Sequence, residues 1–498
     1  MLAIYKRELK SYFRSFIGFL FIAVTLFFLG LYFSVYNLMN GYPYFAYVVS
    51  SVTFLFMLTV PILTMRILAE EKRSKTDQLI LTAPVSVGGI VMGKFLALLT
   101  IFAIPVAIIC FYPLIMAQYG SVPMGEAYLS ILAYFLFGMT AIAIGLFLSS
   151  VTESQVITAV LTFLVLFLGY MMDSICSIIS STGNLLTKLL RCFDLYTPFS
   201  NLLNGTLDVS SIVYYVSVTA LVLFLTVQSI QKRRYSMSVK NLSFSAYSTG
   251  MIAVAVALVV VVNIIMGEMP SSWTAIDMTS QKLYSLTDQT IDYVKNMQDD
   301  VTIYVLVNQD NQDTTLGQTL QRYDDLSDHI TVEYVDPTVN PMFYTQYTTG
   351  NISTNSLIVV SEKRSKVIDY NDVYESSYDF DYSTYSYNTT TTGYDGEGQI
   401  TSALDYVLND DMPKVYMTTG HNELSLSNTF TSALNKENVD YETVNLMDLD
   451  TIPDDAACLF INGATSDFSS DDKDKVIDYL NNGGKVILVT GYTDEETP

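Results

Sequence analysis

The stretch GGIVMGKF, which begins at Gly88, has the spacing of a site that binds nucleotide phosphates. Gly88, Gly93 and Lys94 match a P-loop, G-x-x-x-x-G-K, in which backbone N–H groups and the lysine surround phosphate oxygens. A P-loop also needs a buried strand before it and a Ser or Thr after the lysine to hold magnesium. Here Phe95 follows the lysine, and Pro84 disfavours a preceding strand. We therefore expect Lys94 to mark the end of the apolar segment that follows, and no ATP hydrolysis by this chain.

A second candidate is the stretch TTGHNE, which contains His421 and Glu423. It follows a predicted strand at 414–418, and ligands bind at the carboxyl ends of strands in open α/β sheets. The two side chains could act as an acid–base pair. However, no G-x-S-x-G or H-E-x-x-H motif is present, and Cys458 lies in an apolar predicted strand. We favour a loop that binds a ligand, or that is held by its own hydrogen bonds, over a catalytic site.

Composition disfavours metal and nucleic-acid binding. The chain has two histidines and four cysteines, none in a C-x-x-C pair, and no EF-hand spacing, so we expect no metal site. The four cysteines are Cys110, Cys176, Cys192 and Cys458. Residues 1–266 carry a net charge of +6 and residues 267–498 a net charge of −29. Such an acidic half would repel nucleic acid, and the sharp change predicts two physically different regions.

The first region contains seven apolar runs long enough to cross a membrane core of about 30 Å, which needs about 20 residues. They are roughly 16–37, 44–66, 90–117, 127–149, 155–179, 209–230 and 246–266. The first run is too long for a signal peptide and has no small-residue cleavage site. We therefore predict a multi-pass α-helical membrane domain.

Lysine and arginine positions predict the orientation of these spans. If every run spans, three basic clusters fall on one side, which is then cytoplasmic. They comprise Lys6, Arg7, Lys10 and Arg14; Arg66, Lys72, Arg73 and Lys75; and Lys232, Arg233, Arg234 and Lys240. Everything after about residue 267 is then extracytoplasmic. In the first sixteen residues, apolar positions recur at helical spacing with cations between them, which favours an amphipathic helix on the inner leaflet over a simple extension of the first span.

The segment RILAEEKRSKTDQLILTAPVSVGGIVMGKFLA, residues 66–97, resembles the cytoplasmic loop of ABC-2 type permeases. A second stretch, SSVTESQVITA at 149–159, resembles the short loop between the fourth and fifth spans of that family. The similarity covers residues 1–235. It implies a six-span permease domain of a dimeric exporter. By the same resemblance, a separate cytoplasmic ABC ATPase subunit binds the ATP and drives transport, so that the chain itself needs no cofactor.

The resemblance also implies that the 66–88 segment is a coupling helix that docks on the ATPase. The residues assigned to coupling are Glu70, Glu71, Arg73, Lys75, Thr76 and Glu153. The family usually has Gly where this chain has Lys75, so we expect a straighter helix here. We also expect Glu70 and Glu71 to be exposed, so that reversing both charges would release the ATPase while the bundle stays folded.

The second region alternates predicted strands and helices, which indicates an α/β domain with a mostly parallel sheet. The predicted strands are 301–307, 330–335, 356–360, 414–418, 457–461 and 485–490, and the predicted helices are 285–298, 397–409, 425–438 and 470–482. Residues 375–396 are rich in Tyr, Ser, Thr and Asp and cannot form a core. We interpret them as a mobile or hairpin-like insertion, with a glycan-binding strip of tyrosines as the alternative.

Residues 232–498 resemble the GldG-like auxiliary component of gliding-motility ABC transporters, in motifs such as DMTSQKLYSLTDQT, EGQITSALDYVL and KVYMTTGHNE. The sequence therefore predicts three parts: a permease domain at 1–235, a linker and seventh span at 236–266, and an extracytoplasmic GldG-like α/β domain at 267–498. The family pattern implies that this last domain continues beyond residue 498.

These observations predict the permease subunit of an ABC transporter in a bacterial cytoplasmic membrane, not itself an enzyme, with a fused auxiliary domain. Two alternatives stay open. One is a machine component that passes ATP-driven motion to surface partners without cargo. The other is a membrane-anchored extracytoplasmic hydrolase.

Overall fold

The computed structural model describes residues 1–77, 85–179, 187, 190–232, 242–267, 269, 274–279, 282–283, 285–308, 312–350, 352–381, 386–409 and 411–490. Residues 78–84 of the predicted coupling segment and residues 236–241 of the predicted linker lie outside these residues. The chain forms two compact units, Met1–Ser285 and Leu286–Pro498. Residues 267–285 thus belong to the helical unit.

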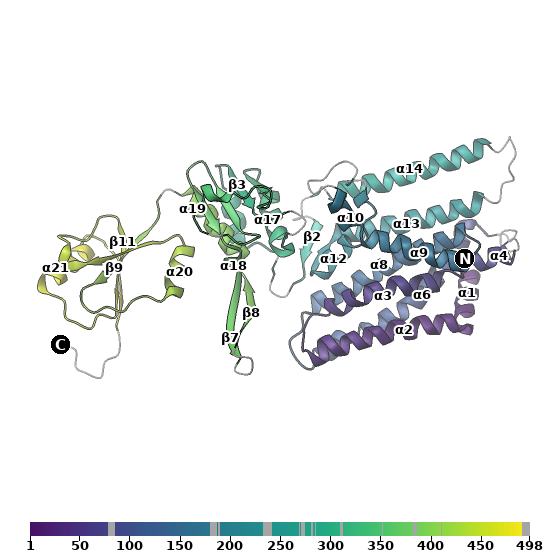
Figure 1. The fold of residues 1–498 in the computed structure, drawn as a ribbon, viewed down its shortest axis with the longest axis horizontal. Helices are drawn as coiled ribbons and strands as arrows, with labels where there is room; N and C mark the ends of the chain where they lie inside the picture. The colour runs from purple at the N-terminus through teal and green to yellow at the C-terminus, as the bar shows by residue number, and fades with distance from the viewer. Residues whose placement is uncertain are drawn as a thin grey trace. The chain divides into compact units, whose positions relative to one another are not determined.

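The first unit is a bundle of long helices with one short strand pair (Figure 1). Its elements are α1 (Leu2–Arg14), α2 (Phe16–Phe33), a π-helical turn (Ser34–Met39), α3 (Ala46–Thr64), α4 (Ala69–Arg73), α6 (Val87–Ile109), α7 (Tyr112–Met116), α8 (Met124–Val151), α9 (Gln155–Tyr170), α10 (Met172–Ile179), α12 (Thr197–Leu203), β1 (Thr206–Asp208), α13 (Val209–Lys232), α14 (Leu242–Gly267) and β2 (Ala275–Asp277).

Six helices among the described residues are long and apolar enough to cross a membrane, and a bent pair raises the number to seven. The bent pair is α9 and α10, which the sequence predicted as one straight span at 155–179. The two helices meet at 57°. The multi-pass prediction is confirmed, and the predicted boundaries agree with the helices to within a few residues at most ends.

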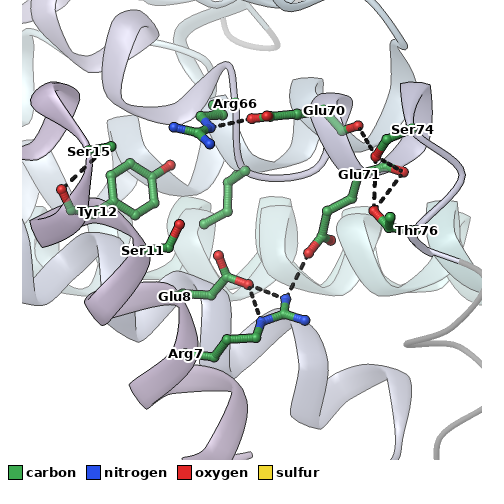
Figure 2. Close-up of a pocket in the computed structure, with 11 residues that line it drawn as sticks. Arg7, Glu8, Ser11, Tyr12, Ser15, Arg66, Glu70, Glu71, Ser74 and Thr76 are labelled. Atoms are coloured by element: carbon green, nitrogen blue, oxygen red, sulfur yellow. Dashed lines mark hydrogen bonds and ion pairs between the residues drawn. The ribbon is translucent and has the colours of Figure 1, made fainter.

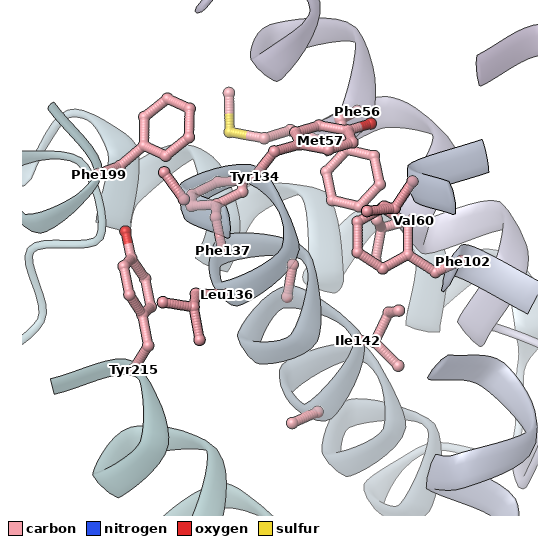
Figure 3. Packing of buried hydrophobic residues seen from close by; sticks show 14 of the residues in the cluster. Phe56, Met57, Val60, Phe102, Tyr134, Leu136, Phe137, Ile142, Phe199 and Tyr215 are labelled. Carbon is pink, nitrogen blue, oxygen red and sulfur yellow. The ribbon is translucent and has the colours of Figure 1, made fainter. Parts of the chain in front are cut away.

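Helix α8 forms the centre of the bundle, and aromatic side chains fill the space around it (Figure 3). Tyr134 of α8 lies between Phe56 of α3 and Phe102 of α6, at ring-centroid distances of 5.0 and 5.4 Å. Phe137, one turn further along, contacts Phe199 of α12 at 5.4 Å. These long-range aromatic contacts hold α3, α6 and α12 against one helix.

Helix α14 lies antiparallel to α13 and is held by polar contacts. Asn263 donates to the Ser217 hydroxyl at 2.9 Å, and the Ser248 hydroxyl donates to Gln228 at 2.8 Å. Strand β2, which follows α14, pairs antiparallel with β1, which precedes α13. The end of α14 and the start of α13 are therefore at the same end of the bundle, as expected if both helices span.

The second unit contains two four-stranded sheets and a separate two-stranded ribbon. Its elements are α16 (Asp288–Lys295), β3 (Val301–Val305), α17 (Thr314–Leu326), β4 (Ile330–Tyr334), a 3₁₀ turn (Tyr344–Gln346), β5 (Leu357–Val360), β6 (Ser365–Ile368), α18 (Tyr370–Val373), β7 (Tyr374–Asp381), β8 (Ser386–Tyr394), α19 (Gly396–Leu408), β9 (Lys414–Thr419), α20 (Asn428–Lys436), β10 (Asp440–Asn445), a 3₁₀ turn (Leu446–Asp448), β11 (Ala456–Asn462), α21 (Ser470–Asn481) and β12 (Val486–Val489).

The first sheet has the order β4-β3-β5-β6 and is mixed, because only β3 and β4 run parallel. The second sheet has the order β10-β9-β11-β12 and is parallel throughout. The α/β fold class with mostly parallel strand pairs is confirmed, although two sheets share the strands that the sequence placed in one. Strands β7 and β8 pair as an antiparallel hairpin, which is one of the two forms expected for the 375–396 insertion.

Candidate functional site

The P-loop-like stretch is helical, not a loop. Helix α6 begins at Val87, and the Ser86 hydroxyl caps it by accepting the Gly89 N–H at 3.2 Å. Gly93 is where α1 comes closest, because a Cβ added there would lie 3.1 Å from the carbonyl oxygen of Met1. The glycine therefore permits close packing of two helices instead of the approach of a phosphate.

Lys94 is fully buried and joins three segments that are distant in sequence. Its Nζ lies 3.0 Å from Glu8 Oε1 of α1 and 2.8 Å from Glu71 Oε2 of α4. It also donates to the carbonyl oxygen of Ile67 at 3.0 Å. The ammonium thus makes two hydrogen bonds, to Glu8 and Ile67, and an ion pair with Glu71. The expectation that Lys94 marks the cytoplasmic end of the span stays a prediction, and the structure adds that its side chain links α6 to α1 and α4 inside the bundle.

Arg7, whose side chain is half-exposed, belongs to the same ionic network. Its guanidinium pairs with Glu8 and contacts Glu71 Oε1 at 2.7 Å. Burial alone would raise the pKa of Glu8, but the positive charges of Lys94 and Arg7 hold that pKa below its ordinary value. Two carboxylates and two cations thus alternate between α1, α4 and α6 (Figure 2 shows Arg7, Glu8 and Glu71).

Helix α4 is short and ends in a Schellman motif. The Thr76 N–H donates to Glu71 O at 3.0 Å and the Lys75 N–H to Lys72 O at 3.2 Å, as this cap requires. Lys75 has φ +57°, the left-handed conformation that glycine adopts most easily. The expected straight helix is wrong, because the lysine takes the turn that a glycine would take.

The second predicted coupling loop lies directly beside α4. The Ser149 hydroxyl accepts the backbone N–H groups of Leu68 and Ala69, at 3.1 and 3.0 Å. Lys72 donates to Val151 O at 3.0 Å and lies 3.6 Å from Glu153. The structure therefore brings the two loops together, with the Glu153 side chain 71% exposed.

Between α1 and the 66–76 segment lies an open pocket of about 250 Å³ (Figure 2). Its lining is mostly polar and consists of Arg7, Glu8, Ser11, Tyr12, Ser15, Arg66, Ile67, Glu70, Glu71, Ser74 and Thr76. Tyr12 donates its hydroxyl proton to Leu63 O at 2.9 Å, which attaches α1 to the end of α3. Arg66 pairs with Glu70 on the opposite wall.

In the second unit, His421 and Glu423 come together as predicted, but inside the protein. The imidazole is buried, stacks on Phe468 at 4.0 Å, and lies 3.5 Å from Glu423 and 3.4 Å from Asp472. Among the residues that the structure describes, neither ring nitrogen has a hydrogen-bond partner, and neither does the buried Thr418 hydroxyl. The Glu423 carboxylate accepts the His421 backbone N–H at 2.7 Å and so shapes the loop.

Two family models match the sequence. The model described as ABC-2 family transporter protein matches residues 31–230, from the end of α2 to the end of α13. The membrane bundle is similar to ABC-2 family transporters. The model described as a domain of unknown function (DUF7088) matches residues 280–373, which contain the first sheet of the second unit. No curated protein matches the chain.

Within the ABC-2-like bundle, the predicted coupling residues separate into an exposed and an internal set. Arg73, Lys75 and Thr76 are exposed, whereas the Glu71 side chain is only 19% exposed and is paired with a buried lysine. The expectation that Glu71 is a freely exposed charge is therefore wrong. Sequence reasoning missed Glu8 and the pairing role of Lys94. The available signal was that Glu8 is the one acidic residue in a basic amphipathic segment.

Proposed function

We propose that this chain is the membrane subunit of an ABC exporter, driven by a separate cytoplasmic ATPase that binds and hydrolyses the ATP. The chain would lie in a bacterial cytoplasmic membrane with residues 267–498 outside. The ABC-2 similarity of residues 31–230 supports the permease assignment. The GldG-like auxiliary role of the second unit is part of the proposal and rests on the sequence motifs alone.

The observation that carries the coupling proposal is the network around Lys94. A charged segment can pass the motion of a docked partner into a bundle only if it is firmly attached to a span. Glu71 of α4 is attached to Lys94 in α6, and Lys94 in turn to Glu8 of α1. A partner that displaced α4 would therefore move α1 and α6 with it.

The ATPase would meet the exposed face of α4 and the loop beside it. Arg73, Lys75 and Thr76 point to solvent around the Schellman turn, and Glu153 is exposed next to Lys72. Interface charges of this kind set partner choice, because juxtaposed like charges cost several kcal/mol when two surfaces dock.

We also propose that two copies form the transport pathway between them. The interior of one bundle is filled around α8, and the cavity beside Thr25 and Tyr134 has a volume of about 10 Å³. A volume of this size is about what one water molecule needs. This small volume favours a pathway for larger cargo at a surface of the bundle.

Co-purification tests the coupling surface. The double variant Arg73→Glu, Lys75→Glu reverses exposed charges and should keep its thermal stability while losing the associated ATPase. The matched control Lys6→Glu, Lys10→Glu changes the net charge equally on exposed positions of α1 and should retain the ATPase. If the ATPase remains with the first variant, or is lost equally from both, α4 is not the docking element.

Labelling of single introduced cysteines tests the orientation. In a background without the four native cysteines, a cysteine at the exposed position Ser376 should react with a membrane-impermeant reagent from outside, and one at the exposed position Ser74 should not. The reverse pattern would rule out the proposed topology.

An ATPase assay of the pure chain tests the assignment of ATP to a partner. The pure chain should show no ATP hydrolysis, and activity that disappears in Lys94→Ala would contradict that assignment.

The hydrolase alternative receives little support from the second unit. His421 is 1% exposed and one face of its ring is covered by Phe468, so the ring is not presented to a substrate in solution. The alternative of a machine component without cargo would use the same ionic network around Lys94. It differs from an exporter only in that the motion is passed to surface partners instead of moving a cargo. A transport assay with reconstituted ATPase would separate it from an exporter.

A further inference from the structure

The pocket between α1 and the 66–76 segment has more hydrogen-bond donors than its own acceptors use. Each carboxylate there already has a cation: Glu70 pairs with Arg66, and Glu8 and Glu71 share Arg7 and Lys94. With three cations for three carboxylates, the cluster is neutral. The walls therefore contain no uncompensated negative charge that would repel an anion.

Unused donors lie on both walls. Arg66 uses only Nε on Glu70, so its two terminal nitrogens have no partner among the described residues. Arg7 uses Nε and one terminal nitrogen, which leaves the other without a partner in the same part of the chain. The exposed Ser11 hydroxyl also has no hydrogen-bond partner there. Guanidinium forks of this kind match the geometry of a phosphate.

The surroundings of the pocket are those of a membrane interface. Lys6, Lys10 and Arg14 are exposed on α1, which lies across the end of the spans (Figure 1). Ser15 lines the pocket, and the next residue begins α2 with apolar side chains turned outward: Phe16 is 74% and Phe19 55% exposed. A polar pocket thus lies beside an apolar helix surface that is suited to hydrocarbon chains.

We propose that this pocket binds the phosphate of an anionic membrane phospholipid, with Arg66, Arg7 and Ser11 as donors and the acyl chains along the start of α2. A free phosphate would use the same donors but would gain nothing from the apolar surface. Basic segments such as α1 are attracted electrostatically to an anionic membrane surface. The proposal requires only that the bundle spans a membrane and is independent of the ATPase.

Native mass spectrometry of the delipidated full chain tests the site, with short-chain phosphatidylglycerol, phosphatidylcholine of equal chain length, and inorganic phosphate as probes. We expect phosphatidylglycerol to bind at least fivefold more tightly than either other probe. The variant Arg66→Gln, Glu70→Gln removes donors without leaving an unpaired carboxylate and should weaken phosphatidylglycerol binding about tenfold, as expected for the loss of charge-assisted hydrogen bonds. Ser11→Trp should also weaken binding by filling the pocket.

Lys10→Gln is the matched control, because it removes a positive charge outside the pocket and should weaken binding less than twofold. Equal losses in Lys10→Gln and in the pocket variant would show nonspecific surface attraction and overturn the proposal. Equal binding of phosphatidylcholine, or of inorganic phosphate, would overturn the lipid assignment. An absence of phosphatidylglycerol binding to the wild-type chain would also overturn the lipid assignment. An acidic side chain of a protein partner would then be the remaining ligand for these donors. Unchanged thermal unfolding of both pocket variants would confirm that they remain folded.

Discussion

Lys94 in the membrane bundle and His421 in the α/β unit are both buried basic side chains between two carboxylates. Lys94 lies 3.0 and 2.8 Å from its carboxylates, within hydrogen-bond distance, and has a backbone carbonyl as its third partner. His421 lies 3.5 and 3.4 Å from its carboxylates, and its two ring nitrogens make no hydrogen bond within the described part of the chain. Lys94 is therefore held by hydrogen bonds as well as by charge, whereas the His421 ring is not.

The difference shows what each cluster connects. Lys94 joins residues 8, 67 and 71 and so connects α1, the end of α3 and α4 to one span. His421 joins Glu423, two residues away, to Asp472 at the start of α21. A hydrogen-bonded ionic cluster between distant segments can transmit force, whereas the looser cluster holds one loop against one helix.

The variant Lys94→Met tests this difference most strongly. Removing one partner of a buried ion pair leaves a carboxylate without compensation, which typically costs 3–5 kcal/mol. We expect the unfolding free energy of the bundle to fall by about this amount. Thermal unfolding in detergent can be followed with a thiol-reactive dye, because Cys176 is a buried free thiol in the bundle.

The double variant Lys94→Met, Glu8→Gln is the control for that prediction. It removes the charge that the single variant leaves unpaired, while Arg7 can still neutralise Glu71. It should therefore recover part of the lost stability. If Lys94→Met lowered the unfolding free energy by less than about 1 kcal/mol, the range of a surface ion pair, the claim that Lys94 holds α1, α4 and α6 together would be contradicted.

In the second cluster, His421→Phe should have a smaller effect. Phenylalanine keeps the stack on Phe468 but leaves two buried carboxylates without the ring, which should cost about 1–3 kcal/mol. Thr418→Val is the matched control, because that hydroxyl is buried and has no partner in the described ranges, so its removal should be neutral or stabilising. Hydrogen exchange of the α21 amides would measure both effects, and equal destabilisation by the two variants would count against a role of the ring.

Asp472→Asn should have a still smaller and pH-dependent effect. Hydrogen bonding from the Ser469 hydroxyl, with the charges of Lys475 and His421, holds the pKa of Asp472 below its ordinary value of 3.8. A carboxylate with a lowered pKa stabilises the fold above about pH 4 and loses this contribution as the pH falls through the folded-state pKa. Wild type and variant should therefore differ in α21 exchange at pH 6 and converge as the pH is lowered toward 3. A difference that stays constant over this range would argue that packing, not charge, is responsible.

In both units, the sequence predicted the helices and strands better than it predicted the contacts among those elements. Apolar length and Lys/Arg position depend on local composition, so the spans could be located, and period-2 and helical patterns located β3 (Val301–Val305) and α19 (Gly396–Leu408) within two residues. The bend after Tyr170 and the separation into two sheets depend on packing between distant segments, which local patterns do not contain.

For the candidate site, the sequence identified the right segments but not their partners. It singled out Gly93, Lys94 and Glu71 separately, yet the pairing of Lys94 with Glu8 joins positions 86 residues apart. One local difference from the family pattern was noted in the sequence, because the ABC-2 resemblance predicts glycine at the position of Lys75. The sequence alone did not show the backbone conformation of Lys75, so the difference was interpreted as a straighter helix. In the structure, Lys75 instead has a positive φ and ends the helix.

The variant Lys75→Gly should therefore have the smallest effect and the opposite sign. A left-handed conformation costs a residue with a side chain roughly 1 kcal/mol, and glycine pays little of this at a helix C-terminus. Glycine also gains entropy in the unfolded chain, which offsets part of the benefit. The Lys75 side chain makes no ion pair among the described residues, so we expect stabilisation of at most about 1 kcal/mol. The matched control is Arg73→Gly, which places glycine in the last turn of α4 and should destabilise it. Hydrogen exchange of residues 69–76 would show whether the turn is strained. Increased protection in Lys75→Gly would support the prediction, whereas a loss of protection would mean that the lysine side chain stabilises the turn.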